Sequence, residues 1–153
     1  DASITKAIKK FKPLSHRLEA VGEYKGIKFI DDAISTTPES TIEALRSLKN
    51  VKTIFLGGED RGYDFTNLER ELRLIGVENV VLFPDTGRRI LSFTTGLRVL
   101  KTKSMQEAVK FAYKVTPQGS ICLLSTASPS YSVWKNFEEK GDLFKKFVKK
   151  YSK

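Results

Sequence analysis

The stretch DDAISTTPEST, residues 31–41, decides the fold, because it is a polar segment between two apolar segments of different periodicity. Residues 27–31 carry a short strand pattern, and apolar residues recur at helical spacing over residues 42–48. Pro38 suits the first helical position and Thr37 suits the N-cap before it. This strand-to-helix loop lies where open α/β sheets bind ligands, at the carboxyl end of a strand. For the loop alone, a purely capping role of its hydroxyls stays open.

The rest of the chain predicts alternating strands and helices. Residues 18–24 and 27–31 form a hairpin that turns at Lys25 and Gly26. Later strands are predicted at residues 51–56, 80–83, 97–100 and 121–124. Two helices are predicted to begin at capping boxes, at Thr66 to Glu69 and at Ser104 to Glu107. Further helices are predicted after a break at residues 84–87 and near the C-terminus. Right-handed βαβ crossovers follow from this order. We expect one α/β, Rossmann-like domain over residues 1–153, with a mainly parallel sheet, helices on both faces and an antiparallel N-terminal edge hairpin.

Length and composition suit one domain of 153 residues with its own core. No apolar run approaches the ~18 residues of a membrane span, and the N-terminus lacks a signal-peptide pattern. A cytoplasmic protein without a membrane partner is therefore expected. Cys122 lies inside an apolar run and is expected to be a buried hydrophobe. One histidine and one cysteine argue against a zinc site, and no metal-binding residue is predicted.

The formal net charge of +9 is concentrated near the two ends of the chain. The lysines concerned are Lys6, Lys9, Lys10, Lys12, Lys145, Lys146, Lys149, Lys150 and Lys153. At the C-terminal end they alternate with apolar residues at helical spacing, which favours a solvated helix face. No nucleic-acid-binding motif accompanies them, so no nucleic-acid partner is predicted. A basic module that binds RNA or anionic surfaces remains the alternative from another functional class.

Two further loops carry polar groups directly after predicted strands. In LGGEDRG, residues 56–62, Arg61 provides a planar guanidinium that suits a carboxylate or phosphate. The structural alternative is an arginine paired with Glu59 or Asp60. The loop STASPS, residues 125–130, offers small residues and hydroxyls that let a ligand approach the backbone. Neither loop is a P-loop or a nucleophile elbow.

Four ordered motifs, HRLE at 16–19, DDAISTTPEST at 31–41, LGGEDRG at 56–62 and LLSTASPSYSVWKNFEEKGDLF at 123–144, resemble the C-terminal domain of the Mur ligases. The resemblance covers nearly the whole chain and is strongest to the D-glutamate-adding members. It implies ATP-dependent amide synthesis, in which the carboxylate of UDP-N-acetylmuramoyl-L-alanine is phosphorylated and the amine of D-glutamate attacks the acyl phosphate. The UDP-binding and central ATPase domains of the family, which hold the Mg²⁺ ligands, lie outside this chain, so the isolated domain is expected to be inactive.

The resemblance also implies roles for individual residues. Arg17 and Asp32 are expected to contact ATP, and the acceptor site for D-glutamate is expected at Thr36, Arg61, Ser130, Tyr131 and Phe137, with His16 and Asn136 in support. The loop departs from the family pattern Asp-Ser-Lys-x-Thr-Asn, because Ala33, Ile34 and Thr37 stand at the Ser, Lys and Asn places. A Mur-type ligase for another amino acid is therefore the closer alternative, to be decided by residues 125–137.

Overall fold

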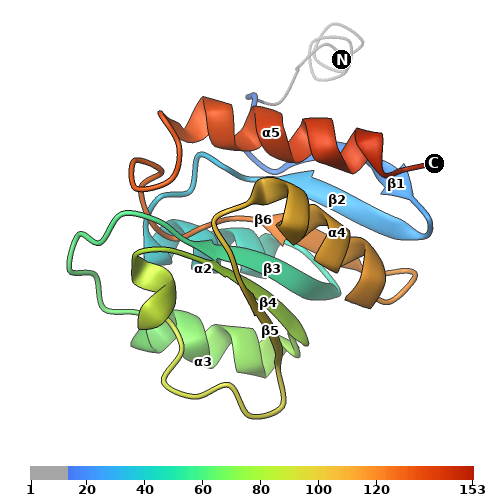
Figure 1. Ribbon diagram of the computed structural model, residues 1–153. Coiled ribbons are helices and arrows are strands. Elements are labelled where there is room, and N and C mark those ends of the chain that lie inside the picture. The colour runs from blue at the N-terminus through green and yellow to red at the C-terminus, as the bar shows by residue number, and fades with distance from the viewer. Residues whose placement is uncertain (1–13) are drawn as a thin grey trace, which may run out of the picture.

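The computed structural model describes residues 14–153, which form one mixed six-stranded sheet with helices on both faces (Figure 1). In chain order the elements are β1 (Glu19–Tyr24), β2 (Ile27–Asp31), α2 (Pro38–Ser47), β3 (Val51–Gly57), α3 (Thr66–Ile75), β4 (Asn79–Phe83), the 3₁₀ helix η1 (Thr86–Arg88), β5 (Arg98–Lys101), α4 (Met105–Val115), β6 (Ile121–Leu124) and α5 (Phe137–Lys150). The strand order is β1-β2-β6-β3-β4-β5. Only β1 and β2 pair antiparallel. The predicted fold class is confirmed, including the edge hairpin.

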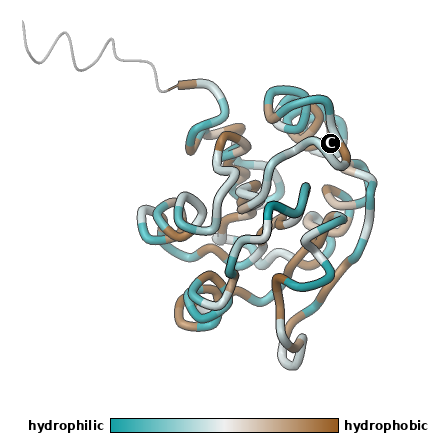
Figure 2. Tube along the Cα trace, turned by 90° about the vertical axis from the view of Figure 1, so that its left-hand side faces the viewer, coloured by the Kyte–Doolittle hydropathy of each residue, from teal (hydrophilic) through white to brown (hydrophobic). Residues whose placement is uncertain are grey.

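Two hydrophobic cores lie on opposite faces of the sheet. On one face, α2 and α3 pack through residues such as Leu45 and Leu68. On the other face, α4 and α5 pack through Met105 and Phe144, and Phe144 contacts the rings of Phe29 and Phe55 from the strands. Figure 2 shows hydrophobic and hydrophilic positions alternating along these helices, as expected for helices with one buried side. The central strands are buried on both faces because helices cover both.

The helix starts agree only partly with the predicted caps. Thr37 caps α2 as predicted, with Ser40 returning a hydrogen bond to the Thr37 backbone. The prediction of a capping box at Thr66 to Glu69 is wrong. Phe65 occupies the N-cap position of α3, and its side chain makes no capping hydrogen bond. Glu69 is instead buried and accepts hydrogen bonds from Ser92. Burial of a glutamate in a long-range contact gives no local sequence signal.

Only half of the capping box predicted at the start of α4 is present. The Ser104 hydroxyl accepts from the Glu107 backbone, but the Glu107 carboxylate accepts from the Thr102 hydroxyl. The helix predicted after residues 84–87 is wrong, because η1 spans only three residues and an irregular segment leads to β5. The Arg89 side chain binds Asp60 and the Tyr63 carbonyl, which holds that segment against the glycine loop.

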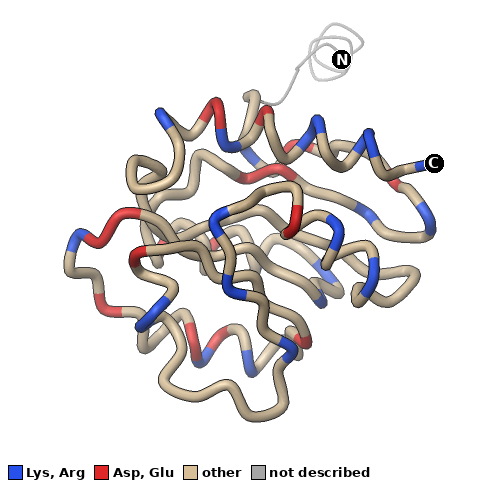
Figure 3. The backbone as a smooth tube through the Cα atoms, in the orientation of Figure 1, with Lys and Arg blue, Asp and Glu red and all other residues tan. Residues whose placement is uncertain are grey.

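The lysines predicted to lie on the solvated face of the last helix follow that prediction except for Lys145. Figure 3 shows lysines along α5 up to the C-terminus. Lys145 is not on the solvated face: it is half-buried, and its Nζ lies 2.6 Å from Glu19 Oε2. Lys6, Lys9, Lys10 and Lys12 lie outside the described residues. Among residues 14–153, no helix is both long enough and apolar enough to cross a membrane.

Candidate functional site

The carboxyl ends of the parallel strands gather the polar loops, as predicted, and hydrogen bonds tie these loops together. After β3, the Gly57 amide donates to the Thr126 carbonyl at 2.9 Å, and the Glu59 amide donates to the Pro129 carbonyl at 2.8 Å. Thr86 and Ser128 share a hydroxyl–hydroxyl bond of 2.7 Å. The loops after β3, β4 and β6 therefore form one continuous surface at this edge of the sheet.

Asp32 is the centre of the polar network after β2. Its carboxylate is buried and accepts from the Ser125 hydroxyl at 2.8 Å and from the Leu18 amide at 3.2 Å. Burial raises the pKa of Asp32, and the hydrogen bonds from Ser35, Ser125 and Leu18 oppose that effect. Thr41 of α2 supports the same network through the Ser125 hydroxyl at 2.9 Å. The predicted residue is thus held rigidly rather than left free on the surface.

A cavity of about 320 Å³ opens beside this network. Exposed Arg17 and buried Asp32 both line it, together with Leu18, Ile34, Ser35 and residues of α2. The two residues predicted to contact a nucleotide therefore share one cavity. Thr36, predicted for the acceptor site, is half-buried and does not line this cavity. Ile34 contributes an apolar wall where the family pattern has a cation.

Lys140 is a fully buried cation beneath the loop at 125–130, and sequence reasoning missed it. Its Nζ donates to the Thr126 hydroxyl at 2.5 Å and lies 5.9 Å from the centroid of the Trp134 ring. Burial lowers the pKa of Lys140 to about 7, while the charges of Asp31 and Asp32 act in the opposite direction. The sequence pattern predicts that a lysine among the charged residues at the start of a helix is solvated. Its burial becomes apparent only from the packing of α5.

Three predicted acceptor residues lie in the loop before α5 and at the first position of that helix. The Ser130 hydroxyl is buried and has no hydrogen-bond partner among the described residues. Tyr131 is 64% exposed, and Phe137 is the first residue of α5. Asn136 caps α5 by accepting from the Glu139 amide at 2.8 Å, so its supporting role is to fix the helix start. An unpaired buried hydroxyl is costly, and a bound ligand would satisfy it.

Arg61 is exposed and pairs with Glu59, as the structural alternative predicted. Its Nη2 lies 2.9 Å from Glu59 Oε2. The hydrogen bond that Arg61 donates to the Glu59 carboxylate raises the pKa of Arg61, and Tyr63 and Tyr131 act in the same direction. Arg61 and Tyr131 stand on two different loops at this edge of the sheet. An exposed ion pair of this kind contributes little to stability, so an anionic ligand can displace Glu59.

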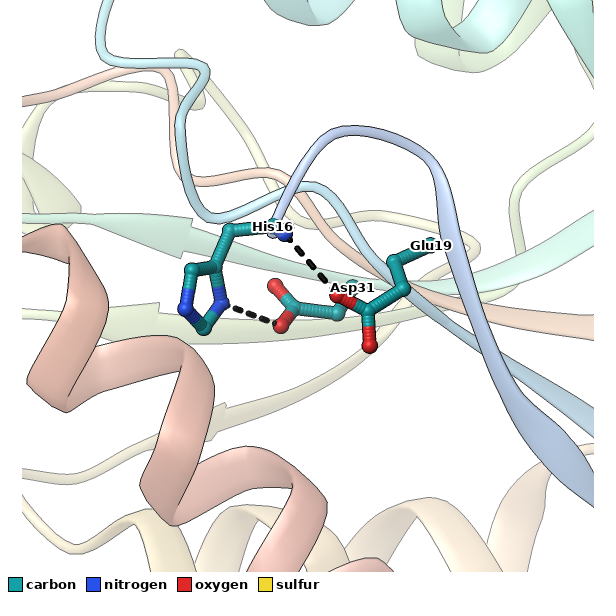
Figure 4. A group of neighbouring side chains, drawn as sticks. All are labelled: His16, Glu19 and Asp31. Atoms are coloured by element: carbon teal, nitrogen blue, oxygen red, sulfur yellow. Dashed lines mark hydrogen bonds and ion pairs between the residues drawn. The ribbon is translucent and has the colours of Figure 1, made fainter. Parts of the chain in front are cut away.

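His16, Glu19 and Asp31 form a cluster of metal-ligand type at the edge of the sheet (Figure 4). His16 Nδ1 lies 2.7 Å from Asp31 Oδ2. Lys145 Nζ lies 2.6 Å from Glu19 and 3.8 Å from Asp31, so an ammonium group already supplies the positive charge. Mg²⁺ prefers oxygen ligands and does not suit this mixed cluster. These residues do not fit the magnesium that the family resemblance implies.

Comparisons with known proteins agree with this arrangement. The family model described as Mur ligase, glutamate ligase domain, matches residues 16–127. A UDP-N-acetylmuramoyl-L-alanine--L-glutamate ligase of Salinispora tropica is 37% identical over 152 residues, which cover 94% of this chain and 33% of the relative. A UDP-N-acetylmuramoylalanine--D-glutamate ligase of Porphyromonas gingivalis is 36% identical over 148 residues, which cover 95% of this chain and 33% of the relative. The chain thus spans about a third of the length of these curated relatives.

Solved structures show the same fold at lower identity. The UDP-N-acetylmuramate-alanine ligase of Thermotoga maritima superposes with a TM-score of 0.64 at 20% identity, over 98% of this chain and 33% of that one. The MurF ligase of the same organism, solved in complex with ADP, gives a TM-score of 0.62 at 17% identity, over 97% of this chain and 36% of that one. The fold, the ordered motifs and the matching model lead to one conclusion: this chain belongs to the Mur ligase family.

Proposed function

We propose that this chain is the C-terminal, acceptor-binding domain of an ATP-dependent ligase that adds D-glutamate to UDP-N-acetylmuramoyl-L-alanine in peptidoglycan synthesis. The buried Ser130 hydroxyl without a partner carries the acceptor assignment, because a donor unpaired among the described residues is available to a ligand at this edge of the sheet. Arg61 and Tyr131 lie on the loops beside it. The relatives named as D-glutamate ligases at about 35% identity support the choice of substrate.

On the nucleotide side, Arg17 and Asp32 act from one cavity. The exposed guanidinium of Arg17 suits a phosphate, and a buried carboxylate such as Asp32 suits a ribose hydroxyl. Asp32 already accepts from Ser125 and Leu18, and each carboxylate oxygen can accept a second bond. The ADP-bound relative supports nucleotide binding by this family of proteins.

On the acceptor side, glutamate carries two carboxylates and an amine that must attack an acyl carbon. Arg61 exchanges its internal partner Glu59 for a substrate carboxylate, and Ser130 donates a hydrogen bond. Phe137 and Tyr131 supply an aromatic wall that limits water at the reacting carbonyl. Lys140 adds positive charge beneath the same loop without contacting solvent. Thr36 completes the set from the loop after β2.

In the proposed reaction ATP phosphorylates the carboxylate of UDP-N-acetylmuramoyl-L-alanine. A Mg²⁺ ion, held by residues other than the described ones, would supply charge neutralisation at the transferring phosphoryl group. Because the chain spans about a third of the length of its curated relatives, we assign the metal ligands, the UDP-sugar site and the P-loop to further domains of a longer cytoplasmic protein. Closure of this domain over those sites positions the glutamate amine against the acyl phosphate, which releases phosphate as the amide forms. Alone, the chain is inactive.

One observation favours a second candidate for the stereochemistry of the acceptor. Two of the relatives, at 37% and 32% identity, are named L-glutamate ligases. Both enantiomers carry the same charges, so Arg61 and Ser130 do not distinguish them by charge alone. The placement of the amine relative to Phe137 and Tyr131 decides which enantiomer reacts.

A chemical-shift titration of the chain with D-glutamate, L-glutamate and L-lysine tests the acceptor site. We expect millimolar D-glutamate binding with shifts at Arg61 and Ser130, and at least fivefold weaker binding after Arg61→Ala, because a charge-assisted bond contributes about 1.5–3 kcal/mol. Arg46→Ala is the matched control, since Arg46 is also exposed and paired, with Glu71, but lies on α2. Equal responses to D-glutamate and L-lysine, or an equal loss in both variants, would contradict the proposal.

A further inference from the structure

The backbone on both sides of Arg17 adopts a conformation that its residues rarely take. His16 has a φ of 63° and Leu18 a φ of 44°, both in the left-handed region. Such a conformation costs a non-glycine residue roughly 1 kcal/mol or more, so surrounding contacts must hold it. Arg17 itself is exposed, and its place at the cavity depends on these two neighbours.

Hydrogen bonds hold the segment at 16–19 against the loop at 31–34. The His16 carbonyl accepts from the Ile34 amide at 3.1 Å, and the Leu18 amide donates to Asp32 at 3.2 Å. The side-chain link between the two segments is the 2.7 Å bond between His16 Nδ1 and Asp31 Oδ2 (Figure 4). Asp31 also accepts from the Ala33 amide, so its carboxylate is fixed before His16 reaches it.

Helix α5 encloses the His16 imidazole from the other side. A Cβ atom at Gly141 would lie 2.1 Å from His16 Nδ1 and 2.7 Å from Asp31 Oδ2, so only glycine lets α5 approach this closely. The Phe137 ring stands edge-on to the imidazole with centroids 6.0 Å apart. His16 is therefore buried between the loop that carries Asp32 and the helix that begins with Phe137.

We propose that His16 is a positioning residue: through Asp31 it fixes Arg17 relative to Asp32 and thereby forms the nucleotide cavity. That the cavity takes a nucleotide rests on the proposed function. The positioning of Arg17 by His16 does not. His16 is not among the residues that line the cavity; it acts through Arg17. Lys145 supplies the positive charge that the carboxylates of Glu19 and Asp31 need, which leaves the histidine to position the segment.

The first test needs no ligand. Hydrogen exchange of the Leu18 and Ile34 amides is measured by NMR in the wild-type chain, in His16→Ala and in His16→Asn. The asparagine amide nitrogen takes the place of Nδ1 and can donate to Asp31, and asparagine tolerates a positive φ. We expect at least tenfold faster exchange in His16→Ala and near wild-type exchange in His16→Asn, with core amides such as that of Val80 as reference.

Asp142→Asn is the matched control, because the exposed Asp142 carboxylate lies 3.6 Å from the other imidazole nitrogen and should not matter. Unchanged Leu18 exchange in His16→Ala would overturn the proposal. So would equal acceleration in His16→Asn and His16→Ala, or an acceleration that the core reference amides share.

The second test is a double-mutant cycle on the ADP affinity of the complete protein that carries this domain. If His16 acts through Arg17, then Arg17→Ala weakens ADP binding at least fivefold in the wild-type background and less than twofold in the His16→Ala background. Additive losses would contradict a role through Arg17. An Arg17→Ala variant that binds ADP as tightly as the wild-type protein would instead count against the proposed function, while the exchange test would still decide whether His16 positions the segment.

Discussion

Gly57→Ala is expected to lower the free energy of unfolding by more than about 3 kcal/mol and to disrupt the loop that carries Arg61. A Cβ atom at Gly57 would lie 2.1 Å from the Phe83 carbonyl oxygen, which belongs to the neighbouring strand and cannot move independently. The φ of 109° adds strain, because residues with a side chain avoid this region. Urea denaturation of the purified chain measures the effect.

Gly62→Ala is the control in the same loop. Its φ of 76° is also positive, but nothing lies within 4 Å of the added Cβ atom. Only the backbone cost of about 1 kcal/mol remains there. Equal losses at Gly57 and Gly62 would show that the close approach of the loop to β4 does not determine its conformation.

Lys140→Met is expected to stabilise the chain at pH 6.5 by roughly 1–3 kcal/mol. The reason is that the Lys140 ammonium is buried and makes a single hydrogen bond, whereas methionine places an apolar side chain of similar length there. The Thr126 hydroxyl keeps its bond to the Ser128 carbonyl at 3.2 Å, so the substitution leaves no unpaired hydroxyl. Asp31 and Asp32 retain their bonds to His16 and Ser125. The cost of the charge therefore exceeds what its one bond contributes.

The same substitution should change how stability depends on pH. Below pH 7 Lys140 is charged in the folded and unfolded chain, and the burial cost applies in full. Between a folded pKa of about 7 and the ordinary value of 10.5, the unfolded chain binds the additional proton, so stability rises with pH. The stability gain of Lys140→Met over wild type should shrink by about 2 kcal/mol between pH 6.5 and 8.5.

Paired urea denaturation curves at both pH values measure this difference, and the comparison at each pH cancels the titration of the other groups. Lys146→Met is the control, since Lys146 is exposed on the same helix. A Lys140→Met variant that is less stable than wild type at pH 6.5, or a gap independent of pH, would show that the ammonium is better compensated than its contacts indicate.

Local patterns predicted the architecture well because strand and helix periodicity and the cap at Thr37 are properties of short segments. The parallel pairing followed from the alternation of strands and helices, whereas the strand order, with β6 between β2 and β3, was not predicted. The helix expected after Pro84 failed, since the Arg89 contacts with Asp60 and Tyr63 hold that segment irregular. Such contacts join residues far apart in sequence and leave no periodic signal.

The site was predictable as a set of loops and not as a network. Asp32 and Arg17 were expected near one ligand, and they line one cavity. The fully buried Lys140 was not expected, because its burial depends on how α5 lies against the loop at 125–130. The glycine at 141 that lets α5 contact His16 is likewise visible only in three dimensions.

The acceptor reaction of the complete protein that carries this domain tests the central claim most directly. The protein is incubated with ATP, Mg²⁺, UDP-N-acetylmuramoyl-L-alanine and one amino acid at a time, and the product is identified by mass. We predict a D-glutamate adduct, with a KM for D-glutamate at least tenfold higher after Ser130→Ala, whose buried hydroxyl then no longer binds the substrate. Adduct formation with L-lysine instead, or no amide product from either enantiomer of glutamate, would contradict the account.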